Sequence, residues 1–90
     1  MTAKRTDANH QQMIDDFRDL GFFVVDTHEL GRGFGDLVVW SPRTKWLPIE
    51  IKSPGGSLNA RERQFHALCP GPIAIVRTRD DVLKLAGATA

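Results

Sequence analysis

The segment from Asp36 to Lys52, DLVVWSPRTKWLPIEIK, constrains the fold of this chain more than any other stretch. It contains two runs rich in β-branched and aromatic residues, which is a composition typical of β-strands. The intervening residues SPRTK are mostly polar, and their proline favours a turn. The sequence therefore predicts two antiparallel strands, over residues 36–41 and 46–52, joined by a short connection.

Helical and strand patterns continue on both sides of this hairpin. Apolar residues recur at helical spacing before Gly21, which suits a helix end because glycine tolerates the left-handed conformation. The predicted elements are, in chain order, a helix over residues 7–20, strands over 22–29, 36–41 and 46–52, a helix from 58 or 59 to 69, a strand over 72–77 and a helix over 78–87. The fold class is therefore α/β, with the order α-β-β-β-α-β-α and a mixed central sheet flanked by helices.

Two of these elements carry explicit expectations about burial. The second helix is expected to turn Leu58, Phe65 and Leu68 inward, together with Cys69. The strand over residues 72–77, PIAIVR, is a continuous apolar run of the kind that is buried on both faces. Each expectation requires another part of the chain to cover these apolar residues.

The 90 residues suffice for one small domain over residues 1–90, with residues 1–5 as a flexible tail. A core this thin makes a homodimer a reasonable expectation. No apolar run approaches the ~18 residues that span a membrane, and the basic start of the chain lacks the apolar segment of a signal peptide. The single cysteine, Cys69, excludes an internal disulfide framework and suits a cytoplasmic location.

The net charge of +1 neither indicates nor excludes nucleic-acid binding, because carboxylates around a metal would offset basic residues elsewhere. Basic residues do fall in local groups that could line a path of phosphates. These groups are Lys4 and Arg5, Arg43 and Lys45, Arg61 and Arg63, and Arg77 and Arg79. For any one pair, a solvated charged surface is the simpler interpretation.

The stretch EIK gives the two faces of one strand different chemistry. Ile49 and Ile51 share one face, whereas Glu50 and Lys52 share the other, with Cβ atoms roughly 7 Å apart. Such a charged pair is usually a solvated strand face with a weak ion pair. Asp36 strengthens a functional interpretation, because the hairpin places it on the neighbouring strand directly after a glycine-rich loop.

Two carboxylates on adjacent strands suit Mg²⁺, which prefers oxygen ligands. We expect Asp36 and Glu50 to bind this metal together with the backbone carbonyl of Ile51. The metal would activate a bound water and withdraw charge from a phosphoryl group. Lys52 would orient or deprotonate that water, or stabilise charge that develops on the phosphate.

With these residues in place, the chain resembles the PD-(D/E)XK nuclease superfamily. Within that superfamily it is most similar to the virus-type replication-repair nuclease (VRR-NUC) group, including its small phage-encoded members. The resemblance lies in Gly33, Gly35 and Asp36, in EIK at residues 50–52, in the stretch PGGSLNARERQFH and in the order of the elements. It covers nearly the whole chain.

The resemblance implies a restriction-endonuclease-like fold and Mg²⁺- or Mn²⁺-dependent cleavage of DNA phosphodiesters. It also implies a homodimer that cuts branched DNA such as four-way (Holliday) junctions, encoded by a phage and acting in the host cytoplasm. Carried over residue by residue, the resemblance makes Asp36 and Glu50 metal ligands and Lys52 the catalytic lysine.

The chain departs from the family pattern in two places. Gly35 stands immediately before the aspartate, where the family often has proline. Glu62 stands on the second helix where the family often has glutamine, and the nearest glutamine is Gln64. We expect Glu62 to support catalysis as a ligand or by positioning water. His10, on the first helix, lies near the place where some members have a polar active-site residue.

The sequence contains no recognisable base-reading element, so we expect recognition of DNA by its shape. Arg32, Arg61 and Arg63 would contact backbone phosphates, which position a protein on DNA without reading its sequence. Trp40 and Trp46 flank the hairpin turn. Cross-strand packing is the more common use of such tryptophans, and stacking on unpaired bases is the alternative.

Two other interpretations stay open. A non-catalytic DNA-binding or assembly subunit could keep the same fold, although binding alone does not require an electronegative pocket. The pair of Glu50 and Lys52 could also be structural in a small α/β domain. A zinc site at His66 and Cys69 is disfavoured, because the chain lacks a second Cys/His pair at matching spacing.

Overall fold

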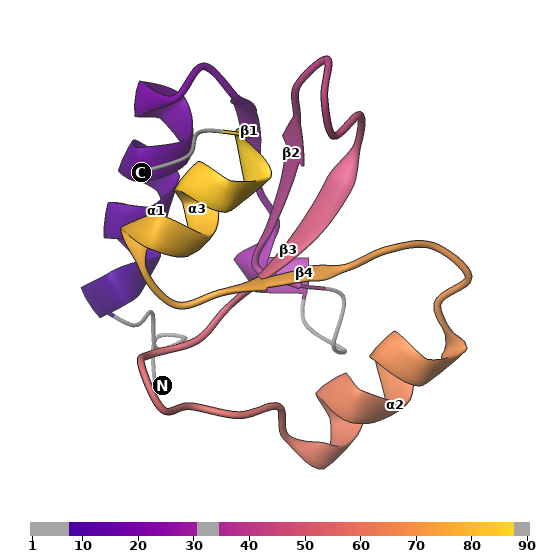
Figure 1. Cartoon of the computed structure of the whole chain (residues 1–90). Coiled ribbons are helices and arrows are strands. Elements are labelled where there is room, and N and C mark those ends of the chain that lie inside the picture. The colour runs from indigo at the N-terminus through magenta and orange to yellow at the C-terminus, as the bar shows by residue number, and fades with distance from the viewer. Residues whose placement is uncertain (1–7, 31–34, 88–90) are drawn as a thin grey trace.

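The computed structural model describes residues 8–30 and 35–87 (Figure 1). Within these residues it contains a four-stranded mixed sheet in the order β1-β2-β3-β4. β1 (Phe23–Asp26), β2 (Leu37–Trp40) and β3 (Leu47–Ile51) form an antiparallel meander, and β4 (Ala74–Val76) pairs with β3 in parallel. The hairpin predicted from the sequence is confirmed.

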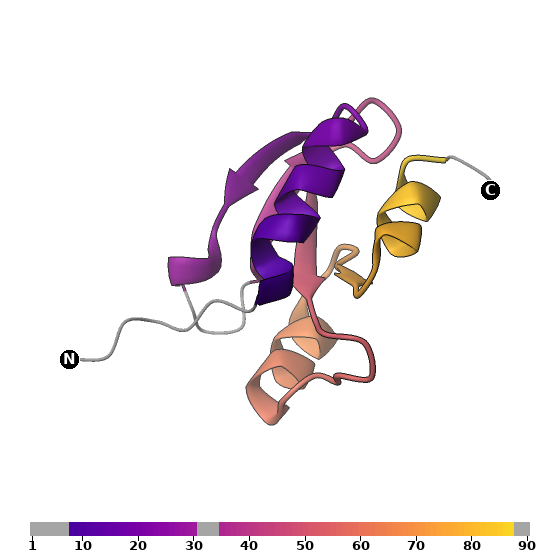
Figure 2. The ribbon, with the colours of Figure 1, turned by 90° about the vertical axis from the view of Figure 1, so that its left-hand side faces the viewer.

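The helices are distributed unequally about this sheet. α1 (Ala8–Asp19) and α3 (Arg79–Leu85) lie side by side on one face, whereas α2 (Ala60–Leu68) lies beyond the end of β3 and away from the sheet (Figures 1 and 2). The predicted α/β class and element order are confirmed, but the flanking helices cover one face. Among the described helices, none has the length and apolar character needed to cross a membrane.

One short element differs from the sequence pattern. A strand was predicted over residues 22–29, but β1 ends at Asp26 and a 3₁₀ helix, η1 (His28–Leu30), follows. The cause is local, because the Asp26 carboxylate accepts a hydrogen bond from the backbone N–H of His28 at 3.1 Å. Aspartate side chains that bind the backbone two residues later favour a turn over a continued strand.

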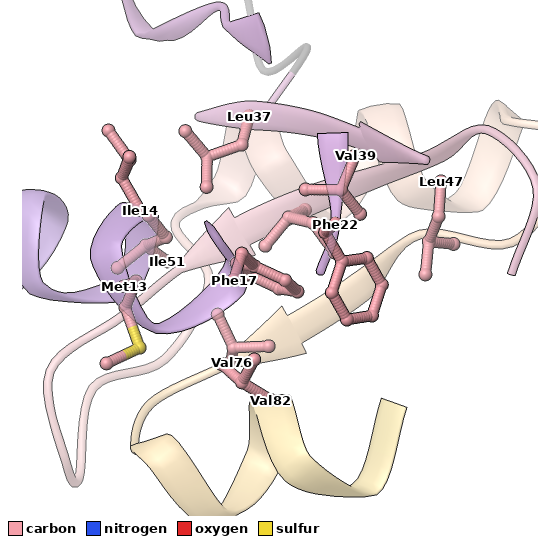
Figure 3. Close-up of a cluster of buried hydrophobic side chains, with 11 residues drawn as sticks. Met13, Ile14, Phe17, Phe22, Leu37, Val39, Leu47, Ile51, Val76 and Val82 are labelled. Carbon is pink, nitrogen blue, oxygen red and sulfur yellow. The ribbon is translucent and has the colours of Figure 1, made fainter. Parts of the chain in front are cut away.

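The hydrophobic core fills the space between the sheet and the pair of helices α1 and α3 (Figure 3). The buried residues of α1 recur at helical spacing, and those of β2 and β3 alternate along their strands, so each element offers one apolar face. The core consists of Met13, Ile14, Phe17, Phe22, Leu37, Val39, Leu47, Ile49, Ile51, Val76 and Val82.

The second helix does not bury the residues that were predicted to face inward. Leu68 is 77% exposed, and Leu58, Phe65 and Cys69 are only partly buried. No residue of α2, a helix that is described throughout, is fully buried. The prediction was wrong because helical spacing of apolar residues does not say what covers them, and α2 lies away from the sheet (Figure 2).

Capping stabilises α2 in place of burial. Asn59 Oδ1 accepts a hydrogen bond from the N–H of Glu62 at 2.8 Å, and Glu62 Oε1 accepts one from the N–H of Asn59 at 2.9 Å. This reciprocal capping box satisfies two backbone donors that the first turn of a helix leaves without partners. It also fixes the position of the Glu62 side chain at the start of the helix.

The strand β4 is also less buried than its apolar sequence predicted. Val76 is fully buried, whereas Ala74 and Ile75 are only partly buried. β4 forms an edge of the described sheet, and its outer face is not covered by α2. The expectation of burial on both faces was therefore wrong.

Candidate functional site

The segment that enters β2 places Asp36 against the end of β3. The backbone N–H of Asp36 donates to the carbonyl of Ile49 at 2.9 Å, and Asp36 Oδ2 accepts a hydrogen bond from the N–H of Ile51 at 2.8 Å. These two bonds hold Asp36 beside the backbone on both sides of Glu50. The proximity that the hairpin predicted for the two carboxylates is present.

Gly35 allows this close approach. Its φ is +119°, a conformation that side chains disfavour and that proline cannot adopt, because the proline ring fixes φ near −65°. A Cβ atom at this position would lie 3.2 Å from the carbonyl oxygen of Ile49. The backbone path therefore requires glycine at this position, where the family that the sequence resembles often has proline, and the glycine allows β3 and Asp36 to approach each other.

Glu50 points to the side of the sheet opposite the core. Its neighbours Ile49 and Ile51 are buried on the face covered by α1 and α3, and side chains alternate along a strand. Glu50 is nevertheless only 3% exposed, and its Oε1 atom is buried without a hydrogen-bond partner among the described residues. An ionised carboxylate in this position is costly unless a proton or a cation compensates it.

The charge of Glu50 is disfavoured by its surroundings. Burial, followed by the nearby carboxylates of Asp36 and Glu62, raises the pKa of Glu50 to about 9 from its usual 4.5. Desolvation and like charge both favour the neutral form of an acid. Without a bound cation, these surroundings therefore favour the protonated form of Glu50.

Lys52 lies next to two of these carboxylates. Its Nζ atom is 2.7 Å from Glu62 Oε1 and 3.8 Å from Glu50 Oε2. Burial alone would lower the pKa of Lys52, but the surrounding carboxylates, Glu62 first, outweigh it and raise the pKa above its usual value. Lys52 is therefore an ammonium ion that carries the positive charge of the cluster.

Glu62 connects this cluster to the start of α2. Its Oε1 atom accepts both the backbone N–H of Asn59 and the ammonium of Lys52. Burial alone would raise the pKa of Glu62, but these two interactions lower it below its usual value. The structure thus places Glu62 with the predicted site residues, whereas Gln64 is exposed on the helix. Asp36, Glu50, Lys52 and Glu62 are called the acidic cluster below.

Two of the three predicted phosphate-contacting arginines lie on α2. Arg61 and Arg63 are exposed on α2, and the Arg63 guanidinium donates to the carbonyl of Leu58. Arg32 lies outside the described residues. Arg77 instead binds the carbonyl of Gly56 through two nitrogens, at 2.8 and 3.1 Å. Of the four arginine and lysine groups, the one on α2 is nearest to the acidic cluster along the chain.

His10 does not join the acidic cluster. Its Nε2 atom lies 3.3 Å from Asp26 Oδ1, and the same oxygen is 2.7 Å from Nδ1 of His28. Asp26 pairs with Leu37, a core residue, so this group faces the side of the sheet that α1 covers. His10, Asp26 and His28 are called the histidine cluster below.

The sequence pattern singled out His10 but did not predict that Asp26 and His28 would lie beside it. Asp26 and His28 stand two residues apart in DTH, and His10 is sixteen residues before Asp26 in the chain. Two histidines and an aspartate at such spacing match no compact motif. Only the packing of α1 against β1 brings them together.

No family model, curated protein sequence or solved structure matches this chain. The functional interpretation therefore depends on the residues themselves and on their geometry.

Proposed function

We propose that this protein is an Mg²⁺- or Mn²⁺-dependent endodeoxyribonuclease with a restriction-endonuclease-like fold of the VRR-NUC type. The observation that carries the proposal is the acidic cluster, in which the Glu50 carboxyl is buried beside Asp36. Its Oε1 atom has no hydrogen-bond partner among the described residues, and its Oε2 atom lies 3.8 Å from Lys52 Nζ. A structural ion pair would not require a second carboxylate that repels the first. A metal site requires both.

The donor atoms fit a hard divalent cation. Asp36 and Glu50 supply carboxylate oxygens, which Mg²⁺ and Mn²⁺ prefer. The N–H of Ile51 already donates to Asp36, and in a strand the N–H and C=O of one residue point to the same neighbour, so the Ile51 carbonyl lies on the edge that holds Asp36. A bound cation would replace the proton that Glu50 otherwise needs.

In this proposal Asp36 and Glu50 would hold a divalent cation together with the Ile51 carbonyl. When bound, the cation would supply polarisation of the scissile phosphate and a lower pKa for a bound water. Lys52 reaches the same space from two residues further along the strand and can orient the attacking water or stabilise charge on the phosphate. Glu62 orients the Lys52 ammonium through its 2.7 Å contact, so it is a positioning residue.

DNA is the proposed substrate, with branched DNA such as four-way junctions preferred. Arg61 and Arg63 are exposed on α2, the helix that also carries Glu62, so phosphates bound there would lie near the acidic cluster. Arg32 is proposed for the same role. A protein that contacts only the phosphates of DNA recognises the path of the DNA backbone, and therefore the shape of the DNA and not its sequence.

The proposal includes a homodimer, in which two sites related by a two-fold axis suit a symmetric junction. The apolar side of α1 is occupied by the core, which leaves the edge strand β1 as the better candidate interface. Phe23 on β1 is 61% exposed and packs edge to face on Trp46, which is 58% exposed. Val25 extends this apolar surface along the strand, at 40% exposure.

A non-catalytic DNA-binding subunit is the second candidate. It is favoured by one contact, since the Lys52 ammonium is already paired with Glu62 at 2.7 Å. A lysine held in this way would be less available to a phosphate. Cleavage measurements separate the two candidates directly.

The test is cleavage of labelled four-way junction, flap and linear duplex DNA with Mg²⁺ or Mn²⁺. The chain is compared with its Lys52→Ala variant and with Lys84→Ala, which removes an exposed lysine from the last turn of α3 as a matched control. We expect Lys52→Ala to bind the junction but to cut it about 10²–10³-fold more slowly, as for loss of one charge-stabilising group in an active site. Lys84→Ala should cut normally.

Two results would contradict the nuclease proposal. Binding of junctions without cleavage by either metal would favour the non-catalytic subunit. Absence of both binding and cleavage would favour the interpretation that Glu50 and Lys52 form a structural ion pair.

A further inference from the structure

The histidine cluster brings together three side chains from separate elements. His10 comes from the first turns of α1, Asp26 from the end of β1 and His28 from the start of η1. Their potential ligand atoms all lie within 4.8 Å of one another. The two imidazole rings meet edge to face with their centroids 4.8 Å apart. The group is therefore assembled by the tertiary fold and not by one flexible loop.

The distances are close to those of a metal ligand shell. Bonds of about 2.0–2.1 Å in a tetrahedral zinc site separate the ligand atoms by about 3.3 Å. His10 Nε2 and Asp26 Oδ1 are already 3.3 Å apart. His28 Nδ1 and Asp26 Oδ1 are 2.7 Å apart, so this pair would have to open by about half an ångström.

The burial of the group also suits a metal site. His10 is only 5% exposed, so its ring is fixed in orientation by the surrounding protein. The side chains of Asp26 and His28 are 39% and 22% exposed, which leaves a route for an ion from solvent. Two nitrogen ligands and one carboxylate would leave a fourth position for water, as in open zinc sites.

We propose that His10, Asp26 and His28 form a binding site for a transition-metal ion of the Zn²⁺ class, separate from the acidic cluster. Imidazole nitrogen suits Zn²⁺, Co²⁺ and Ni²⁺, whereas Mg²⁺ prefers oxygen alone. Without metal, the two rings donate hydrogen bonds to the same Asp26 oxygen. With metal, each ring carries its proton on the other nitrogen and binds the ion through the nitrogen that now faces Asp26.

This site would act on the segment that positions Asp36. Thr27 lies between Asp26 and His28, its backbone N–H donates to the carbonyl of Asp36 at 2.9 Å, and its hydroxyl donates to the carbonyl of Gly35 at 3.2 Å. An ion that fixes Asp26 and His28 would therefore also fix the backbone next to Asp36. Binding of the ion at the histidine cluster does not depend on the proposed nuclease function, whereas any effect of the ion on catalysis through Asp36 does.

The test is a Zn²⁺ titration of the ¹⁵N-labelled full chain, with each imidazole nitrogen observed by NMR. The sequence has three histidines, so His66 serves as an internal reference. We expect Zn²⁺ to change the resonances of His10 Nε2 and His28 Nδ1 and to leave those of His66 unchanged. Asp26→Asn should weaken Zn²⁺ binding at least about tenfold, as the loss of metal-site groups does elsewhere.

Glu50→Gln is the matched control, because it alters the acidic cluster and leaves the histidine cluster intact. It should not change the Zn²⁺ affinity measured at His10 and His28. The proposal is overturned if saturating Zn²⁺ leaves both rings unchanged, or if Glu50→Gln removes binding and Asp26→Asn does not. If Asp26→Asn fails to fold, His28→Gln replaces it, since His28 lies in the short helix η1.

Discussion

The two faces of the sheet differ in what holds them together. On one face, α1 and α3 bury a continuous apolar layer, and the histidine cluster at its margin satisfies its carboxylate with two imidazoles. On the other face, three carboxylates surround one ammonium, and a buried oxygen of Glu50 has no hydrogen-bond partner among the described residues. The first face supplies stability, whereas the second retains unfavourable electrostatics that a bound cation would relieve.

The largest effect should come from the packed face. Phe17 is fully buried and contacts Phe22 edge to face with ring centroids 5.0 Å apart. Phe17→Ala should lower the free energy of unfolding by about 3–5 kcal/mol, because it removes apolar contacts and leaves a cavity. Leu68→Ala, on the exposed surface of α2, should change it by less than about 0.5 kcal/mol. Urea denaturation of both variants measures the difference, and equal effects would mean that α2 packs on the protein in solution.

The contact between Glu62 and Lys52 should matter for activity more than for stability. Glu62→Gln keeps an oxygen that can complete the capping box but removes the ion pair with Lys52. We expect the proposed DNA cleavage activity to fall about 10- to 100-fold, as for loss of an outer group that orients a residue of a metal site. Asn59→Ala is the matched control, because it weakens the cap and leaves Glu62 charged. A larger loss of cleavage in Asn59→Ala would show that the helix end matters and the ion pair does not.

The acidic cluster should also make stability depend on pH. The pKa of Glu50 is raised from 4.5 to about 9, so between these values the native protein binds more protons than the unfolded chain. Stability of the metal-free protein therefore falls as pH rises through this window, by about 1–2 kcal/mol up to pH 7 after allowance for relaxation of the buried group. Glu50→Gln should remove this slope. Urea denaturation in the presence of a chelator at pH 5, 6, 7 and 8 measures it, and a stability that rises with pH would show that the Glu50 proton does not control the slope.

The histidine cluster should give a smaller effect of opposite sign. Partial burial alone would raise the pKa of Asp26, but hydrogen bonds from His28 and His10 outweigh it and lower the pKa below its usual 3.8. The stability that Asp26 contributes is therefore present above pH 3.8 and is lost as pH falls through its lower native pKa. Because its side chain is 39% exposed, solvent screening should keep this contribution below about 1 kcal/mol. Asp26→Asn should destabilise the metal-free chain by that amount in thermal unfolding at pH 7, and no change would show that the cluster does not tie α1 to β1.

Asp36, Glu50 and Lys52 could be found from the sequence because their arrangement is local to one hairpin. Strand alternation separates Glu50 and Lys52 from the two isoleucines, and the short SPRTK connection fixes which residues face Asp36. Glu62 was predicted from the resemblance alone, and its contact with Lys52 depends on where α2 begins. The resemblance to VRR-NUC nucleases itself stays a prediction.

The position of α2 and the histidine cluster could not be found in this way. An apolar spacing such as that of Phe65 and Leu68 indicates a face of the helix but not what covers that face, and in this protein Leu68 is exposed. His10 and Asp26 meet only because α1 crosses β1, a contact that neither residue specifies by itself. Both the position of α2 and the assembly of the histidine cluster depend on tertiary packing, which no local sequence pattern predicts.

The parallel pairing of β4 with β3 has a consequence for the order of folding. The meander of β1, β2 and β3 needs only short connections. β4 runs parallel to β3, so it can pair only after residues 52–73 have returned to the end of the sheet at which β3 begins. Contacts between residues far apart in sequence form slowly, because the loop must close before the contacts stabilise it. Within this pairing, Ile75 of β4 lies opposite Glu50 of β3, and α3 follows β4 in the chain. A nascent chain would thus present the β2–β3 hairpin to its surroundings while the strand that completes Glu50's environment is still being made.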